Sequence, residues 1–237
     1  MRTVHPHLQL AQRLFISNVW LLDAGSGSRL LVDTGHPLER FTLRRALWRA
    51  GIRGRGDLAA VLLTHRHSDH AGNAAWLRRT FDCPVACHAR DAEILAGRAP
   101  RPRLARGLAH VHEELLCHVE DRYPARSPVD EVFGPGAWKW GLRVLEVPGH
   151  TEGSVMLHHE ATGTLFSGDA ILSGPPPLRL LEALSLAVPG FSVDAEACHA
   201  RVRACLAQLP PVKTLCAGHG PAVTRETHAK LLRLISG

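Results

Sequence analysis

The sequence predicts an α/β protein in which short buried strands alternate with amphipathic helices. Residues 58–63 form a continuous apolar run with a β-branched residue at its centre, which is typical of a strand buried on both faces of a sheet. Residues 38–50 before this run have apolar side chains at helical spacing, and a second strand-like run at 84–88 follows it. Strands and helices that alternate in this way form layered α/β folds.

The chain is expected to begin with three strands, at residues 13–17, 19–23 and 30–33. The Gly25-Ser26-Gly27 sequence between the last two is a strong signal for a hairpin turn. Asp33 stands at the end of the third strand. Its carboxylate either orients a metal-bound histidine or caps a turn, and the local sequence does not separate these two readings.

The helix predicted at 38–50 ends at Gly51, which favours the left-handed backbone of a helix C-terminus. The apolar strand at 58–63 follows. After it we expect a helix at 71–79, the strand at 84–88 and a short helix at 90–96. This order continues the alternation on which the α/β prediction rests.

Four side chains that can bind metal lie within six residues directly after the strand at 58–63. His65 and His67 are two residues apart, so in extended backbone they point to the same side and can chelate one ion. Asp69 and His70 stand at the turn into the next helix and can reach a second ion. A histidine-rich set with added carboxylate suits zinc, iron or manganese better than calcium or magnesium. The cluster therefore predicts a dinuclear metal site.

Residues 98–128 are interpreted as a helical insertion that faces solvent. They contain further histidines, but on a helix His110 and His112 point roughly 200° apart, so we do not expect them to share a metal ion.

Three more metal-competent residues follow predicted strands in the second half of the chain. His150 follows a strand at 143–147, Asp169 follows one at 164–168, and His219 follows one at 212–216. His158 and His159 alternate faces within a strand, and we expect them at the surface and edge of the sheet rather than as ligands.

A helix at 194–209 and a closing helix that Thr224 caps complete the predicted elements. The apolar residues between 171 and 191 are consistent with a wall over the site, a dimer contact or core packing. The sequence leaves these three alternatives open, and with them the possibility of a homodimer.

Composition limits the classes of protein that the chain can belong to. Hydrophobic residues make up 45% and charged residues 21% of 237 positions, which is ordinary for one globular domain spanning 1–237. No stretch approaches the roughly 18 unbroken apolar residues of a membrane helix, and the first residues lack the apolar core of a secretory signal. We therefore expect a cytoplasmic protein with no membrane partner. The net charge of +6 comes without a nucleic-acid motif, so a nucleic-acid partner is not expected.

Five motifs resemble the landmarks of the metallo-β-lactamase superfamily, and they cover nearly the whole chain in the family's order. They are Asp33-Thr34-Gly35, the segment 64–70, Pro148-Gly149-His150-Thr151, Ser167-Gly168-Asp169 and Gly218-His219-Gly220. The resemblance implies a four-layer αββα sandwich, classed as α/β or in some schemes α+β. It also implies two halves, at about 1–125 and 126–237, with the metals at the edge of the sheets.

Carried over residue by residue, the resemblance assigns seven ligands. It implies that the first ion is bound by His65, His67 and His150, the second by Asp69, His70 and His219, and that Asp169 bridges them. Two such ions, most readily Zn²⁺ with Fe or Mn as alternatives, share a hydroxide that attacks the substrate. Among these residues Asp69 and Asp169 are the ones to which we assign a catalytic role.

The bridging Asp169 resembles the glyoxalase II, lactonase and phosphodiesterase branches rather than the β-lactamases. We therefore expect a hydrolase of a small ester, thioester or lactone. The chain ends soon after Gly220, which leaves no room for the glutathione-binding domain of a full-length glyoxalase II, and it lacks the tyrosine that follows the aspartate in many lactonases. The alternatives are a phosphodiesterase or nuclease of the same fold, and an iron-dependent oxidoreductase resembling the persulfide dioxygenases.

Overall fold

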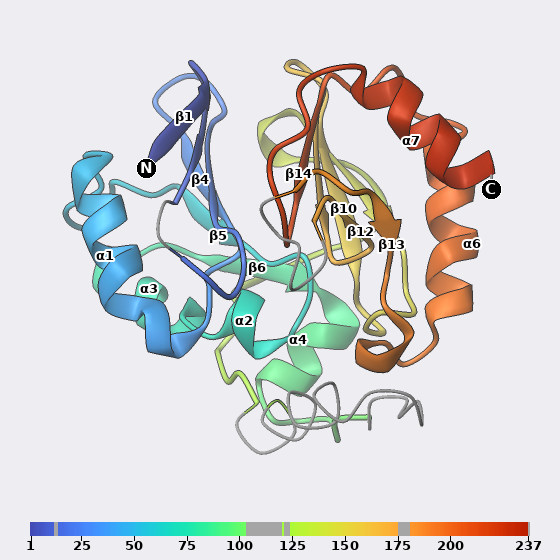
Figure 1. Cartoon of the computed structure of the whole chain (residues 1–237). Helices are drawn as coiled ribbons and strands as arrows, with labels where there is room; N and C mark the ends of the chain where they lie inside the picture. The colour runs from blue at the N-terminus through green and yellow to red at the C-terminus, as the bar shows by residue number, and fades with distance from the viewer. Residues whose placement is uncertain (12–13, 103–119, 121–123, 175–180, 237) are drawn as a thin grey trace.

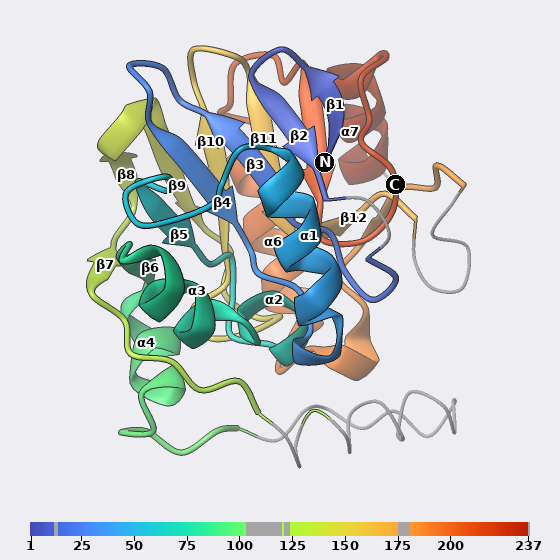
Figure 2. The ribbon, with the colours of Figure 1, turned by 90° about the vertical axis from the view of Figure 1, so that its left-hand side faces the viewer.

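The computed structural model describes residues 1–11, 14–102, 120, 124–174 and 181–236. Two β-sheets face each other at the centre of the molecule, and helices cover the outer side of each (Figure 1). The four-layer αββα sandwich that the family resemblance implies is confirmed. The view in Figure 2 shows the strands of the two sheets stacked behind helix α1.

The first sheet has seven strands in the described part of the chain, and they neighbour one another in chain order. The strands β1 to β4 are antiparallel, and β4 to β7 are parallel. Their bounds are β1 (Arg2–His5), β2 (Leu8–Leu10), β3 (Trp20–Asp23), β4 (Arg29–Val32), β5 (Ala60–Leu62), β6 (Val85–His88) and β7 (Glu131–Phe133).

The second sheet has the strand order β14-β11-β10-β9-β8, in which only the β11–β14 pair is parallel. A two-stranded ribbon, β12 with β13, lies between β11 and β14 in the chain. The bounds are β8 (Gly136–Trp138), β9 (Leu142–Glu146), β10 (Val155–His159), β11 (Thr164–Gly168), β12 (Ile171–Leu172), β13 (Ser185–Leu186) and β14 (Thr214–Ala217).

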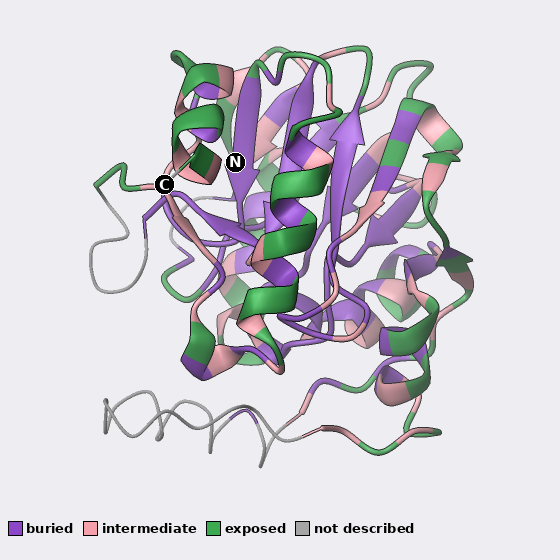
Figure 3. Ribbon diagram, turned by 90° about the vertical axis from the view of Figure 1, so that its right-hand side faces the viewer, coloured by how far each residue is buried: buried purple, intermediate pink, exposed green. Residues whose placement is uncertain are grey.

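The helices α1 and α3 lie outside the first sheet, and α6 and α7 lie outside the second (Figures 1 and 3). In Figure 3 the outward face of α6 is largely exposed, whereas the strands behind it are buried. The helical bounds are η1 (Pro37–Glu39), α1 (Arg40–Arg49), α2 (Ser68–Ala71), α3 (Ala74–Phe81), α4 (Ala89–Leu95), η2 (Lys139–Gly141), η3 (Pro189–Phe191), α6 (Ala195–Leu206) and α7 (Thr227–Ser236).

Alternation along the strands of the second sheet divides the apolar residues between two cores. On β10 the side chain of Leu157 belongs to the core between the sheets, whereas its neighbour Met156 packs into the core under α6 and α7. Phe166 and Leu165 on β11 divide in the same way. Successive side chains of a strand point to opposite faces, so one continuous apolar run supplies both cores.

Two expectations for the N-terminal part were wrong. Residues 14–17 form a loop rather than a strand, and the first strands are β1 and β2, which the sequence analysis missed. The backbone N–H groups of Phe15 and Ile16 donate to the carboxylate of Glu39 instead of to a neighbouring strand. The prediction for the start of the closing helix was also wrong. The helix begins at Thr227, so Thr224 does not cap it.

Most of the proposed insertion at 98–128, including His110 and His112, lies outside the described residues, as does part of the 171–191 segment. Among the residues that the structure describes, no helix combines the length and the apolar character needed to cross a membrane.

Candidate metal centre

Seven side chains meet where several strands of both sheets end. His65 and His67 follow β5, and Asp69 and His70 lie on the short helix α2. His150, Asp169 and His219 follow β9, β11 and β14 respectively. The structure thus brings together every residue that the sequence analysis proposed as a ligand.

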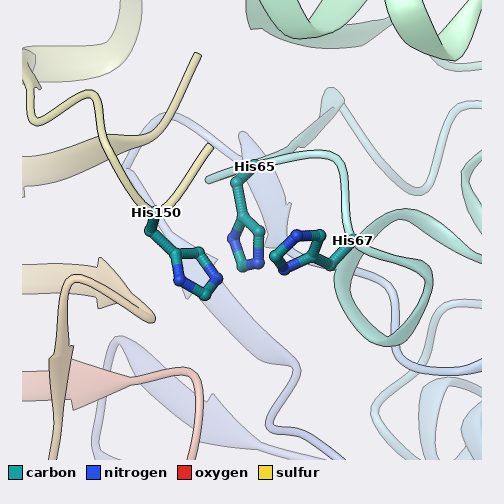
Figure 4. A group of neighbouring side chains, drawn as sticks. All are labelled: His65, His67 and His150. Carbon is teal, nitrogen blue, oxygen red and sulfur yellow. The ribbon is translucent and has the colours of Figure 1, made fainter. Parts of the chain in front are cut away.

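The first group consists of His65, His67 and His150, which are all buried. Their ring centroids lie 4.6–4.8 Å apart, and each pair of rings meets edge to face. Figure 4 shows His150 approaching from a different segment of the chain than the other two. One nitrogen from each ring lies within 4.8 Å of the others, a spacing that allows all three to bind a single ion.

The second group consists of Asp69, His70 and His219, whose ligand atoms also lie within 4.8 Å of one another. The Asp69 carboxylate lies 3.5 Å from Nε2 of His70 and 3.3 Å from Nε2 of His219. One carboxylate and two imidazoles provide the mixed nitrogen and oxygen ligands that zinc, iron and manganese accept.

Asp169 lies between the two groups. Its Oδ1 atom is 3.3 Å from Nε2 of His70, and its Oδ2 atom is 3.2 Å from Nε2 of His219. The same Oδ2 atom is 3.8 Å from Nε2 of His150, which belongs to the first group. A single carboxylate therefore faces ligands of both groups.

Hydrogen bonds at Nδ1 fix the orientation of three of the histidine rings. His65 pairs with the Thr64 hydroxyl at 3.0 Å, His70 with Asp33 at 2.8 Å, and His150 with the hydroxyl of Ser192 at 3.1 Å. Partners of this kind hold the ring and leave the other nitrogen free to bind a metal.

The Nε2 atoms of His65, His67, His70 and His150 are buried and have no hydrogen-bond partner among the described residues, and the same holds for Oδ1 of Asp169. Buried polar atoms without partners are rare in proteins, and a bound ion accounts for them. At Gly218 a Cβ atom would lie 2.1 Å from Oδ1 of Asp169, so only glycine lets this strand end approach so closely. The residues present therefore fit a pair of divalent ions.

Asp33 acts on the site rather than only on a turn, which decides between the two sequence readings. Besides His70, its carboxylate accepts hydrogen bonds from the backbone N–H of Thr64 at 2.9 Å and from the Thr64 hydroxyl. Asp33 has a φ of 60°, a left-handed conformation that aspartate and asparagine tolerate better than most residues. This backbone turn carries the carboxylate from the end of β4 to the metal motif.

The first group is electrically neutral in the metal-free protein. Burial lowers the pKa of His65 and His67 well below the ordinary value, and the neighbouring histidines act in the same direction. Burial likewise lowers the pKa of His150 to about 4, although Asp169 opposes the shift. Neutral imidazole is the form that binds metal, so these three rings need lose no proton near neutral pH.

The second group holds internal ion pairs. Burial alone would lower the pKa of His219, but the carboxylates of Asp169 and Asp69 outweigh it and raise this pKa to about 9. The same balance raises the pKa of His70 well above its ordinary value. Burial opposes ionisation of the two carboxyl groups, yet the histidines lower the pKa of both well below the ordinary value. In the metal-free protein His70 and His219 therefore carry protons that a bound metal ion would replace.

Several residues that contact the site could not be found from the sequence. Ser192, the partner of His150, lies 42 residues away in the chain, and a lone serine carries no motif. Glu120 accepts hydrogen bonds from the backbone N–H of Ser68 at the start of α2. The Ser17 hydroxyl donates to the backbone carbonyl of Asp69. Each of these contacts depends on the tertiary fold, so no local pattern marks it.

The prediction that His158 and His159 lie at the surface and edge of the sheet was wrong, because both are buried. Neither belongs to a candidate metal group among the described residues. A strand in the middle of a sheet with helices on one side and a second sheet on the other has no solvent face.

Comparisons with known proteins agree with this geometry. A model of the metallo-β-lactamase superfamily matches residues 13–219. The probable metallo-hydrolase YybB of Bacillus subtilis is 31% identical over 171 residues, which cover 68% of this chain and 67% of that protein. A hydroxyacylglutathione hydrolase of Cereibacter sphaeroides is 31% identical over 210 residues, which cover 89% of this chain and 64% of that protein.

Among solved structures, TTHA1623 in a di-iron-bound form superposes with a TM-score of 0.64 at 26% identity, covering 94% of this chain and 96% of that one. The extent of the match to the curated relatives varies. A hydroxyacylglutathione hydrolase of Bdellovibrio bacteriovorus is 32% identical, but the aligned part of this chain spans only 35% of its length.

Proposed function

The chain belongs to the metallo-β-lactamase superfamily, and we propose that it is a dinuclear metal-dependent hydrolase of a small ester, thioester or lactone. The position of Asp169 carries this proposal. Its carboxylate lies 3.2–3.8 Å from ligand atoms of both groups, the arrangement needed for one residue to bridge two ions.

We assign His65, His67 and His150 to one ion, Asp69, His70 and His219 to the other, and Asp169 to both. When bound, two such ions would polarise a scissile carbonyl and lower the pKa of an attacking water. The protein's own contribution is to hold the ligands and to keep them dry. Asp33, Thr64 and Ser192 fix the ligand rings, and burial removes competing water from the ligand nitrogens.

The acyl substrate class is supported by the names of the relatives. Relatives named hydroxyacylglutathione hydrolase align with up to 89% of this chain, and their name describes cleavage of a thioester. The excess of arginine had motivated the nuclease alternative, but the positions of these residues give that alternative no support. Arg44, Arg45 and Arg49 are exposed on α1, which covers the outer face of the first sheet.

The identity of the metal remains part of the proposal. We propose zinc, and iron is the alternative that the di-iron form of TTHA1623 makes worth testing. A persulfide dioxygenase needs one iron only, whereas this chain places a second complete group beside the first. We further propose a cytoplasmic protein that takes a small-molecule substrate and requires neither a membrane nor nucleic acid.

Metal analysis combined with a substrate panel tests the proposal. The purified protein is expected to bind two metal ions per chain and to hydrolyse a generic thioester, ester or lactone. Asp169→Ala and His67→Ala should abolish turnover and reduce bound metal while the fold persists by circular dichroism. Asp82→Asn is the control, because Asp82 is an exposed aspartate at the end of α3, away from the ligands.

Three results would contradict the proposal. One iron per chain with oxygen uptake would instead indicate an oxidoreductase. Turnover of bis(p-nitrophenyl) phosphate alone would indicate a phosphodiesterase. Near-normal activity of Asp169→Ala would show that no bridging carboxylate is needed.

A further inference from the structure

The metal motif contains a buried arginine between two of its histidines. His65 and His67 point toward the site, and Arg66 lies between them on the chain. Its side chain is only 1% exposed, which is exceptional for arginine. A cation in this position is costly to bury and needs an explanation beyond packing.

The partners of Arg66 come from two other segments. Its Nη2 atom donates to Glu152 at 2.9 Å, and its Nε atom lies 3.8 Å from Oδ1 of Asp91 on α4. Among the described residues, Nε and Nη1 have no hydrogen-bond partner, so the guanidinium is poorly satisfied. A buried ion pair with such geometry contributes little to stability, because desolvation offsets the attraction.

Asp91 in turn holds the loop that carries His150. Its Oδ2 atom accepts from the Thr151 hydroxyl at 2.7 Å, and its Oδ1 atom accepts from the backbone N–H of Gly153 at 3.0 Å. A Cβ atom at Gly153 would lie 2.7 Å from the Asp91 side chain, so glycine is what allows this close approach. Asp91 is fully buried.

We propose that the chain Arg66–Asp91–Thr151 is a positioning device that sets the distance between the two segments forming the first metal group. Arg66 lies between His65 and His67 in the sequence, and Thr151 directly follows His150. None of its three residues is a ligand or touches the reacting atoms. The inference rests on the proposed function, since it concerns the affinity of the first group for metal.

The need for precise positioning explains why charged residues, rather than apolar ones, link the two segments. Asp91 accepts two hydrogen bonds from the His150 loop and attracts the guanidinium of Arg66 by charge, and Arg66 adds a directional contact through its hydrogen bond to Glu152 in that loop. Apolar packing between the same segments would tolerate sliding, whereas three histidine nitrogens must converge within tenths of an ångström to share an ion.

The test compares Thr151→Val with Thr151→Ser. Valine has the shape of threonine without its hydroxyl, and serine keeps the hydroxyl. Metal-free protein is titrated with Zn²⁺ against a chromophoric chelator, and two binding steps are assigned with His67→Ala and His219→Ala. We expect Thr151→Val to weaken the step that His67→Ala removes by about 10-fold or more, with the other step unchanged. Thr151→Ser should restore that step to within about 3-fold of the wild type.

A double variant separates positioning from stability. Arg66→Met with Asp91→Asn removes both buried charges, and the amide oxygen can still accept from the backbone N–H of Gly153, so we expect a melting temperature close to that of the wild type together with the same selective loss of Zn²⁺ affinity. Arg78→Met is the matched control, because Arg78 pairs with Asp130 at 2.6 Å in the same half of the protein but away from the ligands. It should leave both Zn²⁺ steps unchanged.

Three outcomes for Thr151→Val would overturn the inference. They are equal weakening of both Zn²⁺-binding steps, weakening of the step that depends on His219 alone, and unchanged Zn²⁺ affinity in both steps. Failure of Thr151→Ser to restore affinity would overturn it as well. If the wild type bound two Zn²⁺ but hydrolysed no acyl substrate, the proposed function would fail while the affinity measurements still decided this inference. If it bound no Zn²⁺, both would be overturned.

Discussion

Replacing Asp33 by asparagine tests how strongly a residue outside the ligand set controls the metal centre. Asparagine is the appropriate replacement because the φ of Asp33 is 60°, where alanine would add backbone strain to the loss of the carboxylate. The wild-type carboxylate accepts from Nδ1 of His70 and from both the backbone N–H and the hydroxyl of Thr64. Asparagine offers one acceptor oxygen and one N–H₂ donor in the same space.

The expected magnitude follows from these three donors. Whichever way the amide turns, its donor faces either His70 or the backbone N–H of Thr64, and one buried donor is left without an acceptor. This costs about 1–3 kcal/mol of unfolding free energy, or roughly 2–12 °C in melting temperature for a chain of this size. His70 also loses the partner that orients it, for which a 10–100-fold loss of metal affinity is typical.

The assay is chelator competition with Zn²⁺ together with thermal unfolding of the metal-free protein. Asp82→Asn is the matched control, since Asp82 also has a left-handed backbone, with a φ of 53°, but is exposed at the end of α3. We expect the control to match the wild type in both measurements. Wild-type Zn²⁺ affinity in Asp33→Asn would refute the argument that the His70 contact controls the second metal group.

Two further predictions follow from the pKa shifts. Zn²⁺ binding to the metal-free protein at pH 7.5 should release about two protons, from His70 and His219. The number released should decline as the pH rises past about 9, where His219 is already neutral. Calorimetry in buffers of different ionisation enthalpy measures the proton release, and binding heats that do not depend on the buffer would contradict the prediction. His158→Leu should raise the melting temperature and reduce the acid-side loss of stability. Burial lowers the pKa of His158, so the unfolded chain binds more protons below about 6.5 and the wild type loses stability there. An unchanged pH dependence of the melting temperature between 5 and 6.5 would count against this explanation.

The sequence predicted individual strands and helices because each depends on a pattern within its own residues, whereas the four-layer arrangement was implied by the resemblance to the superfamily. The run at 58–63 became β5, and the strands predicted before His150, Asp169 and His219 correspond to β9, β11 and β14. Edges and surfaces were predicted less well. Leu38 and Phe41 continue the helical pattern into α1, yet they are 85% and 77% exposed, since periodicity does not show where the protein surface lies.

The candidate ligands could be predicted from the sequence, whereas the residues that position them could not. Five of the seven candidate ligands follow a strand end, and Asp69 and His70 lie on the short helix α2 that comes soon after β5. Strand ends meet at one edge of a sandwich. The supports are ordinary residues whose roles arise from contacts across the chain. Asp91 lies 60 residues from Thr151, and nothing in its surroundings in the sequence distinguishes it from the exposed acidic residue Glu93 on the same helix.

The two metal groups are held together by different physical means, and this difference follows from their charges. In the metal-free protein the second group has its own cohesion, because His70 and His219 are protonated and face Asp69 and Asp169. The first group consists of neutral rings, and no ion pair joins one of them to another. Its geometry must therefore be imposed by other residues, through the Ser192 hydroxyl that pairs with Nδ1 of His150 and through the buried contacts that link its two segments. Support from surrounding residues is for this reason needed most where the ligands themselves are uncharged.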